Sequence, residues 1–370
     1  MKRVFSFFVS FFVLFGAYAA DYRAVLVADI DSGRVLYQEN ANELNYPASL
    51  TKIMTLYLTF DALEHNRLHL DDYLIVSKYA TEAQPVKLGL TAGSKIKVED
   101  AIKAVAVHSA NDVARVLAEN LKGGKEGNFA DLMTRVANEI GLQHTNFENS
   151  SGLPNDDHLS TARDIAVLSM AVYKHFPQYW KYFGIKSWTY NGKTYTNGNR
   201  LLGTYPGCDG MKTGFTNKSK YSLVATAKRD GHHLIAVVLG AANKDVRAQV
   251  ATKMLNVGFN RVGITSSQTA SYHTATPTDA NPVAKYAMPV ENNTVSYSTG
   301  GVGVQCGAFS AFDAAKKQAN KVKSVTGFEP EIEQNDMGLY RVRIKGLSEG
   351  AAQNLNGIAA TNGIDCYVFH

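Results

Sequence analysis

Cysteine is scarce in this chain of 370 residues, which has only three: Cys208, Cys306 and Cys366. Their spacing fits no zinc-binding pattern, and the ten histidines never fall at metal-ligand spacing on one expected element. The sequence therefore predicts no metal site. In an oxidising compartment three cysteines permit one disulfide and leave one thiol over. We interpret Cys208 as a small buried side chain rather than as a catalytic thiol.

Long apolar runs and a strong charge of one sign are also lacking. Beyond residue 20 no stretch approaches the length needed to span a membrane. Basic residues outnumber acidic ones by only 38 to 33, which excludes a dedicated nucleic-acid binder. The first 20 residues differ, with a basic start at Lys2 and Arg3, an apolar centre from Val4 to Phe15 and small residues from Ala17 to Ala19. This pattern predicts a secretory signal peptide at 1–20, with an uncleaved anchor as the alternative, and hence an exported protein.

Glycine-rich phosphate loops are absent as well. Gly300 to Gly303 precedes an expected strand but lacks the following glycine spacing of a dinucleotide-binding loop. Gly123 to Lys125 lacks both the spacing and the preceding strand of a phosphate loop. The sequence therefore predicts no cofactor.

Apolar periodicity predicts a mixed fold for the first two thirds of the chain. One hairpin is expected from Tyr22 to Gln38 and a second from Tyr221 to Leu239, where alternating or β-branched residues flank short turns. Helices are expected between and after them, around 49–60, 99–107, 112–121, 129–140, 161–173 and 246–257. This order predicts an α+β fold for residues 21–262, with sheet strands from both ends of one domain.

The composition changes after Arg261. Ser266 to Glu291 is rich in Ser, Thr, Ala, Asn and Pro without apolar periodicity, which predicts a flexible linker at 263–299. A compact unit is expected at 300–370, in the order strand 302–308, helix 310–325, hairpin 329–344, helix 348–361 and strand 365–369. This βαββαβ order is typical of ferredoxin-like folds.

Ser49 and Lys52 lie at the start of an expected helix that is apolar on nearly every face. Three residues make close to one helical turn, so the hydroxyl and the amine share a face. Desolvation there would favour a neutral lysine, which could take the proton of the serine and make it a nucleophile. Alone the pattern is weak, because a snorkelling lysine beside a serine at a helix start fits it too.

Two further motifs strengthen this interpretation. Ser109-Ala110-Asn111 lies on a tight connection between two helices, with Asn111 expected as a helix cap. Lys212-Thr213-Gly214 comes just before the second hairpin, so it should lie on or beside an edge strand. Ser-x-x-Lys, Ser-x-Asn and Lys-Thr-Gly in this order form the signature set of penicillin-binding proteins and serine β-lactamases.

Acyl transfer explains these residue types. Ser109 and Lys212 suit a relay that returns a proton to the leaving group, and Asn111 can hold a substrate amide. Gly214 allows close approach to an edge strand, whose backbone from Thr213 to Phe215 can bind an extended peptide. Backbone N–H groups of Ser49 and Phe215 would form the oxyanion hole.

Residues from about Tyr22 to Phe259 resemble the D-alanyl-D-alanine carboxypeptidases, which are low-molecular-mass penicillin-binding proteins. Besides the three motifs, the similar stretches are Phe147 to Leu153, Ser160 to Asp164 and Asp209 to Gly214. The resemblance implies a β-lactamase/transpeptidase-like catalytic fold, with an antiparallel sheet and a helical subdomain. It also implies that Arg247 binds the terminal carboxylate of the peptide, a task that suits a guanidinium; a solvated arginine at a helix start is the plainer interpretation.

Residues 300–370 resemble the SPOR (sporulation-related repeat) domain, through Val304 to Phe309 and Leu339 to Ile344. The resemblance implies binding to peptidoglycan glycan strands that lack stem peptides, and hence enrichment at the division septum. On an open sheet face the sugar contacts would be Gln305, Tyr340 and Arg341. The plainer interpretation is that these are ordinary solvent-exposed residues, because exposed side chains alternate along any such strand. Cys306 and Cys366 would lie on neighbouring strands of this fold, so we predict a disulfide between them.

Together these resemblances imply a periplasmic or cell-envelope enzyme that removes the terminal D-alanine from stem peptides ending in D-Ala-D-Ala. β-Lactams would acylate the same serine. Three alternatives stay open: a DD-endopeptidase of peptide cross-links, a serine β-lactamase, and a glycan-binding protein with a silent catalytic domain. A β-lactamase needs a glutamate that activates the deacylating water, and Glu148 is the only nearby candidate in the sequence.

Overall fold

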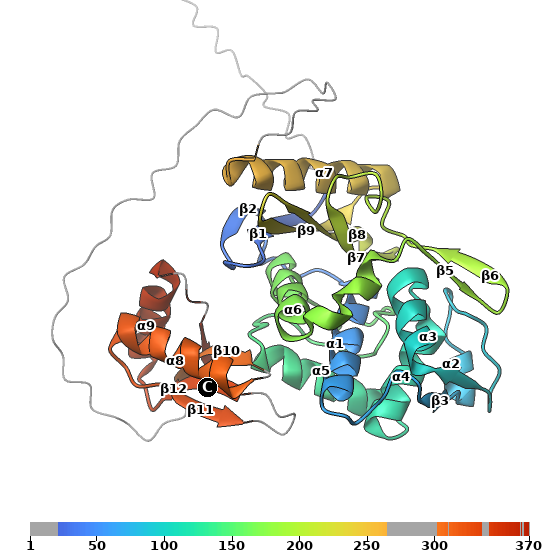
Figure 1. The fold of residues 1–370 in the computed structure, drawn as a ribbon, viewed down its shortest axis with the longest axis horizontal. Coiled ribbons are helices and arrows are strands. Elements are labelled where there is room, and N and C mark those ends of the chain that lie inside the picture. The colour runs from blue at the N-terminus through green and yellow to red at the C-terminus, as the bar shows by residue number, and fades with distance from the viewer. Residues whose placement is uncertain are drawn as a thin grey trace, which may run out of the picture.

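The computed structural model describes residues 21–264, 302–309, 311–334, 340–362, 364 and 366–369 (Figure 1). The predicted signal peptide and nearly all of the predicted linker lie outside this range. The described residues form a large N-terminal unit, hereafter called the catalytic unit because it contains the predicted catalytic residues, and a small C-terminal unit, hereafter the C-terminal module.

A five-stranded antiparallel sheet is the framework of the catalytic unit. Its strand order is β2-β1-β9-β8-β7, so β1 near the start of the unit pairs with the late strand β9, with Ala24 opposite Leu239. The strands are β1 (Ala24–Asp29), β2 (Val35–Glu39), β7 (Cys208–Thr216), β8 (Lys220–Arg229) and β9 (His232–Ala241). Both predicted hairpins and the predicted contribution of both chain ends are therefore confirmed.

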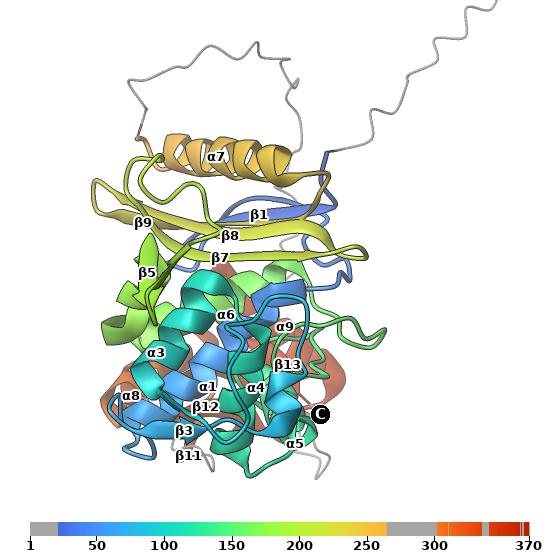
Figure 2. The same ribbon diagram turned by 90° about the vertical axis from the view of Figure 1, so that its right-hand side faces the viewer.

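Alternating residues of the sheet pack into two cores. Val25 and Val27 of β1 contact helix α7 (Lys244–Arg261), whereas Leu26 and Ala28 face the helical layer on the other side. Figure 2 shows α7 on one side of the sheet and the helical layer on the other. Both faces of the sheet are thus covered, which explains why its central strands are almost wholly apolar.

The helical layer surrounds helix α1, which is buried on all sides except at its last residue. Such a helix must be apolar all round, as the sequence predicts for it. The elements of the layer are η1 (Ala48–Thr51), α1 (Lys52–Glu64), α2 (Lys78–Thr81), α3 (Val98–Lys103), η2 (Ala104–His108), α4 (Asn111–Lys122), α5 (Glu126–Glu139), α6 (Ala162–His175) and η3 (Pro177–Gly184), with a small two-stranded sheet of β3 (Tyr73–Ile75) and β4 (Lys95–Lys97).

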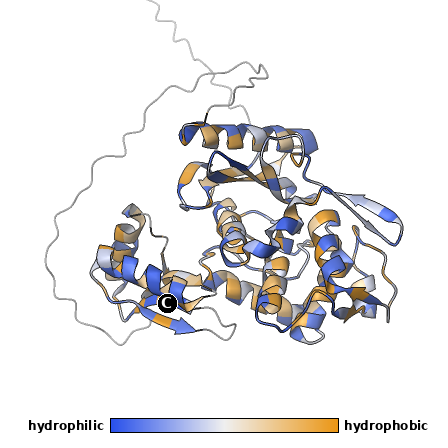
Figure 3. Ribbon diagram, viewed as in Figure 1, coloured by the Kyte–Doolittle hydropathy of each residue, from blue (hydrophilic) through white to orange (hydrophobic). Residues whose placement is uncertain are grey.

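Some local predictions were wrong. The aromatic stretch from Tyr179 to Tyr195, for which no hairpin was expected, contains β5 (Ser187–Tyr190) and β6 (Lys193–Thr196), a largely hydrophilic hairpin that projects from the sheet (Figure 3). Helix α5 begins at Glu126, three residues before the start predicted at 129. Thr161 caps α6 near the start of the helix predicted around 161–173, because its hydroxyl accepts the N–H of Asp164 at 3.0 Å.

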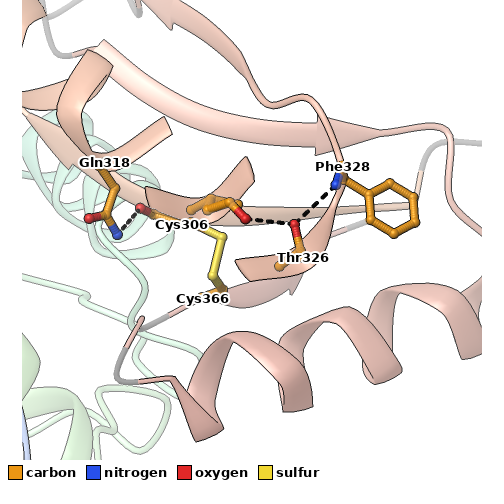
Figure 4. Close-up of a disulfide and its surroundings, with 6 residues drawn as sticks. Cys306, Gln318, Thr326, Phe328 and Cys366 are labelled. Atoms are coloured by element: carbon orange, nitrogen blue, oxygen red, sulfur yellow. Dashed lines mark hydrogen bonds between the residues drawn. A yellow bond between two sulfur atoms is a disulfide. The ribbon is translucent and has the colours of Figure 1, made fainter. Parts of the chain in front are cut away.

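The C-terminal module has the predicted βαββαβ order. Its sheet order is β11-β12-β10-β13, all antiparallel, and helices α8 and α9 pack on one face. The elements are β10 (Gly303–Phe309), α8 (Phe312–Thr326), β11 (Glu331–Gln334), β12 (Tyr340–Lys345), α9 (Glu349–Thr361) and β13 (Tyr367–Phe369). The predicted disulfide is present, and it joins Cys306 of β10 to Cys366 next to β13 (Figure 4).

Within the described parts of the chain, no helix is both long and apolar enough to cross a membrane.

Candidate active site

Ser49 and Lys52 lie where the short helix η1 runs into α1. Lys52 Nζ is 3.1 Å from Ser49 Oγ, 2.7 Å from Asn111 Oδ1 and 2.6 Å from the carbonyl oxygen of Ser151. The Lys52 side chain is completely buried. Burial, reinforced by the charge of Lys212, holds the pKa of Lys52 well below its ordinary value. A neutral amine in contact with a hydroxyl is the arrangement that an activated serine needs.

A loop from Asn149 to Leu153 fixes this serine turn. Asn149 Oδ1 accepts the backbone N–H groups of Ser151, Gly152 and Leu153. Gly152 has a φ of +76°, and a Cβ there would lie 1.8 Å from the carbonyl oxygen of Ala48. Only glycine can therefore bring this loop onto η1 and place the Ser151 carbonyl against Lys52.

Ser109 faces the same site from the end of η2. Its φ of +65° is left-handed, which ends the helix and turns the side chain towards β7. Lys212 Nζ donates to Ser109 Oγ at 2.9 Å and to the carbonyl oxygen of Thr213 at 3.0 Å. Burial, and secondly the charge of Arg247, lower the pKa of Lys212 to about 7. This amine can therefore give or take a proton near neutral pH.

Strand β7 is an edge strand, as predicted for the Lys-Thr-Gly motif. A Cβ on Gly214 would lie 3.1 Å from the carbonyl oxygen of Pro47 and 3.3 Å from the backbone nitrogen of Ser49. Glycine thus lets β7 lie against the serine turn. Phe215 leaves 47% of its surface exposed, and its ring packs on Tyr221.

Arg247 lies in the first turn of α7 and is buried, not solvated. Its guanidinium donates to the carbonyl oxygens of Gly198 at 3.3 Å and Ser222 at 3.5 Å, and its Nε has no hydrogen-bond partner among the described residues. Burial and the charge of Arg200 lower its pKa to about 10. A buried cation with unused hydrogen-bonding capacity suits an incoming carboxylate.

Asn111 differs from its prediction. It is the first residue of α4 and does not cap it; its Oδ1 accepts from Lys52, and its Nδ2 donates to the carbonyl oxygen of Gln84. Both ends of the amide are therefore used within the protein, so Asn111 orients Lys52. The sequence did not predict that the Ser151 carbonyl accepts a hydrogen bond from Lys52. A backbone acceptor has no residue type of its own, so the only signal in the sequence is the neighbouring Gly152, which positions it.

Two other residues that the sequence analysis considered as catalytic candidates, Glu148 and Cys208, take no part in the contacts around Ser49. Glu148 is exposed and accepts hydrogen bonds from Asn146 and Asn155. Burial raises the pKa of the Cys208 thiol to about 11, so it stays protonated, in keeping with a small structural side chain. The described residues hold no group of side chains that could bind a metal.

The three residues predicted on one face of the C-terminal sheet do not lie together. Gln305 and Arg341 are on the face away from the helices, where Gln305 is fully buried against Glu139. Tyr340 was misplaced: it packs towards the helices, with its ring 5.4 Å from that of Phe312. Neighbouring residues of a strand point to opposite faces, so Tyr340 and Arg341 cannot share one.

Family models match two parts of the chain. The model for D-alanyl-D-alanine carboxypeptidases matches residues 17–243, and the SPOR domain model matches residues 298–369. Among solved structures, penicillin binding protein 5 from Haemophilus influenzae has a TM-score of 0.63 at 32% identity, over 65% of this chain and 71% of that chain. Penicillin-Binding Protein D2 from Listeria monocytogenes, in its ampicillin-bound form, has a TM-score of 0.60 at 31% identity, over 66% and 99%.

Curated relatives agree with these matches. D-alanyl-D-alanine carboxypeptidase DacF of Bacillus subtilis is 35% identical over 248 residues, which are 66% of this chain and 63% of the relative. D-alanyl-D-alanine carboxypeptidase DacC of Escherichia coli is 38% identical over 248 residues, which are 65% of this chain and 62% of the relative. The chain thus spans slightly less than two thirds of the length of these relatives. Because the family model covers more than half of the chain, this protein belongs to the D-alanyl-D-alanine carboxypeptidase family.

Proposed function

We propose that the protein is a serine-type D-Ala-D-Ala carboxypeptidase that removes the terminal D-alanine from peptidoglycan stem peptides. The observation that carries this proposal is the buried Lys52 amine, 3.1 Å from the Ser49 hydroxyl. Membership of the family supports it, as do the names of the relatives.

The proposed reaction proceeds through an acyl-enzyme on Ser49. Neutral Lys52 takes the proton of Ser49 while Oγ attacks the carbonyl carbon between the two D-alanines. The backbone N–H groups of Ser49 and Phe215 stabilise the oxyanion. Lys212 then passes a proton through Ser109 to the nitrogen of the leaving D-alanine, and the C–N bond breaks. Water then attacks the ester and gives a proton to Lys212, while Ser49 Oγ leaves with the proton held by Lys52, and the shortened peptide is released.

The substrate would lie along the edge strand β7, with its backbone hydrogen-bonded to Thr213, Gly214 and Phe215. Its terminal carboxylate would bind Arg247. Because the terminal carboxylate is part of what is recognised, the site favours a free D-alanine end over a cross-link. β-Lactams, whose ring resembles the D-Ala-D-Ala peptide, would acylate Ser49 as well.

For the whole chain we propose a signal peptide at 1–20, a catalytic domain at 21–262, a linker at 263–299 and a SPOR domain at 300–370. The SPOR domain would bind denuded glycan strands and enrich the exported enzyme at the division septum. The SPOR family match supports this role.

Product analysis tests the proposed activity against its alternatives. A pentapeptide muropeptide should lose one D-alanine, while cross-linked dimers should stay intact. Cleavage of dimers without release of terminal D-alanine would identify an endopeptidase instead.

Penicillin turnover tests the β-lactamase alternative. We expect slow deacylation that Glu148→Gln leaves unchanged. The Glu148 carboxylate is at the surface, where it accepts hydrogen bonds from Asn146 and Asn155 and does not contact Ser49. Fast turnover that Glu148→Gln abolishes would identify a β-lactamase.

A further inference from the structure

The sheet of the C-terminal module has one face that its own helices leave uncovered. Val304, Cys306, Val342 and Ile344 point towards α8 and α9 and form the core of the module. In the sheet register Gln305 lies beside Arg343 on one side and Tyr367 on the other, so these three share the opposite face. Arg341 lies on that face too, two residues before Arg343. We call these four residues the docking face.

This face lies against the end of helix α5 of the catalytic unit (Figure 1), and strand β10 also comes close to the end of α6. Gln305 Nε2 and the Tyr367 hydroxyl both donate to the carbonyl oxygen of Glu139, the last residue of α5, with the tyrosine bond at 3.4 Å. Arg341 Nη1 is 3.8 Å from the Glu139 carboxylate. As a result Gln305 is completely buried, although no helix of its own module covers it.

The chemistry of the contact matches the end of a helix. The last carbonyl groups of a helix lack intrahelical partners, and the aligned peptide dipoles make that end negative. The last turn of α5 contains no basic residue of its own. The docking face brings two hydrogen-bond donors to the Glu139 carbonyl and places the cationic Arg341 beside its carboxylate.

The local geometry of α5 also leaves room for the module. Gly141 follows α5 with a φ of +98°, and a Cβ there would lie only 3.4 Å from the Tyr367 ring. At the end of α6, the ring of His175 lies close to the backbone of Ala308 of β10. The contact therefore joins several polar groups on both units.

We propose that the end of α5 is a docking site for the C-terminal module, and that it competes with glycan for the docking face. The competition rests on the proposed glycan binding, which the resemblance places on this sheet face. A docked module would have to leave Glu139 before a sugar chain could reach Gln305 and Arg341. Glycan binding would then release the module from the catalytic unit, because the two partners share one surface.

Glu139→Lys in the full-length protein tests this proposal, since it puts a positive charge against Arg341 without altering the docking face. Asp131→Lys is the matched control, because Asp131 is an exposed carboxylate of the same helix that lies outside the contact. Hydroxyl-radical labelling without glycan reports docking through Tyr367. Tyr340, on the helix side of the same sheet, serves as the internal reference.

We expect Glu139→Lys to raise labelling of Tyr367 several-fold relative to Tyr340, and Asp131→Lys to behave as the wild type. The concentration of denuded glycan that sediments half of the protein should fall about three- to tenfold for Glu139→Lys alone, because more of the module is free to bind.

Each part of the proposal has its own contrary result. Equal Tyr367 labelling in wild type and Glu139→Lys would overturn the docking. Increased labelling with unchanged glycan binding would overturn the competition. Failure of every variant to sediment with glycan would overturn the proposed glycan function and the competition with it, while the labelling result would still decide the docking.

Discussion

Three buried basic side chains, Lys52, Lys212 and Arg247, dominate the site at the scale of single residues. Burial is the main cause that lowers the pKa of each of them. The charge of Lys212 lowers the pKa of Lys52 further, and the charge of Arg247 does the same for Lys212. Neutral Lys52 can act as a base, whereas Lys212 with a pKa of about 7 can still donate a proton at neutral pH. The two lysines are therefore suited to opposite tasks in acylation.

Arg247→Gln tests this division of tasks. Removing its charge should raise the pKa of Lys212, so protonated Lys212 would persist to higher pH. The alkaline limb of the pH profile for acylation should then move up by about one pH unit, and KM for a peptide with a free carboxylate should rise. Arg200→Gln is the control, because Arg200 is exposed and paired with Asp245. An alkaline limb that does not move would contradict the role of Lys212 as the proton donor.

At the scale of elements, the proposed catalytic residues depend on the contact between η1 and the Asn149–Leu153 loop. Gly152 lies at its tightest point, where a Cβ would meet the Ala48 carbonyl. Gly192, in the β5–β6 turn, has nearly the same φ of +75° but nothing within 4 Å of its Cβ position. An alanine at Gly192 would therefore introduce backbone strain alone, whereas an alanine at Gly152 would add a steric clash.

Gly192→Ala should lower the free energy of unfolding by about 1 kcal/mol, the cost of a left-handed alanine, and should leave acylation unchanged. Gly152→Ala should cost several times more and slow acylation at least about tenfold, since it must displace Ser49 or Ser151. Chemical denaturation and penicillin acylation rates measure both effects. Equal effects of the two substitutions would show that the contact with Ala48 does not hold the serine turn.

The sequence predicts those elements whose signal is local. Helix α1, both hairpins and the βαββαβ order follow from apolar periodicity and turn residues. The order of the three motifs predicts that Ser49, Ser109 and Lys212 lie in one site. Contacts made by backbone carbonyls or by distant elements do not follow from it. The bond from Lys52 to the Ser151 carbonyl and the burial of Gln305 by Glu139 join residues 99 and 166 positions apart. Apart from Gly152, which lies next to Ser151, no residue pattern near the partners indicates these contacts.

At the scale of the whole molecule, the two units are stabilised differently. The catalytic unit has two large apolar cores on the faces of its sheet, whereas the C-terminal module has one small core and a disulfide. The disulfide closes a loop of 60 residues, for which the loss of chain entropy in the unfolded state corresponds to about 4 kcal/mol. That amount is large for a module of this size.

Cys306→Ser with Cys366→Ser should therefore unfold the C-terminal module at a lower temperature and abolish sedimentation with denuded glycan. Penicillin acylation should not change, because the site lies in the catalytic unit. Cys208→Ser, which removes the remaining cysteine, is the control and should affect neither property. A parallel loss of acylation would mean that the catalytic unit depends on the module for its own folding.

The acyl-enzyme on Ser49 is tested most directly by labelling with a fluorescent penicillin, followed by mass spectrometry of the digested protein. We expect the label on the peptide that contains Ser49, no label in Ser49→Ala, and slower labelling of the same peptide in Ser109→Ala, which keeps the nucleophile but lacks the relay. Label retained by Ser49→Ala, or found on any other peptide, would contradict Ser49 as the nucleophile and Lys52 as its base.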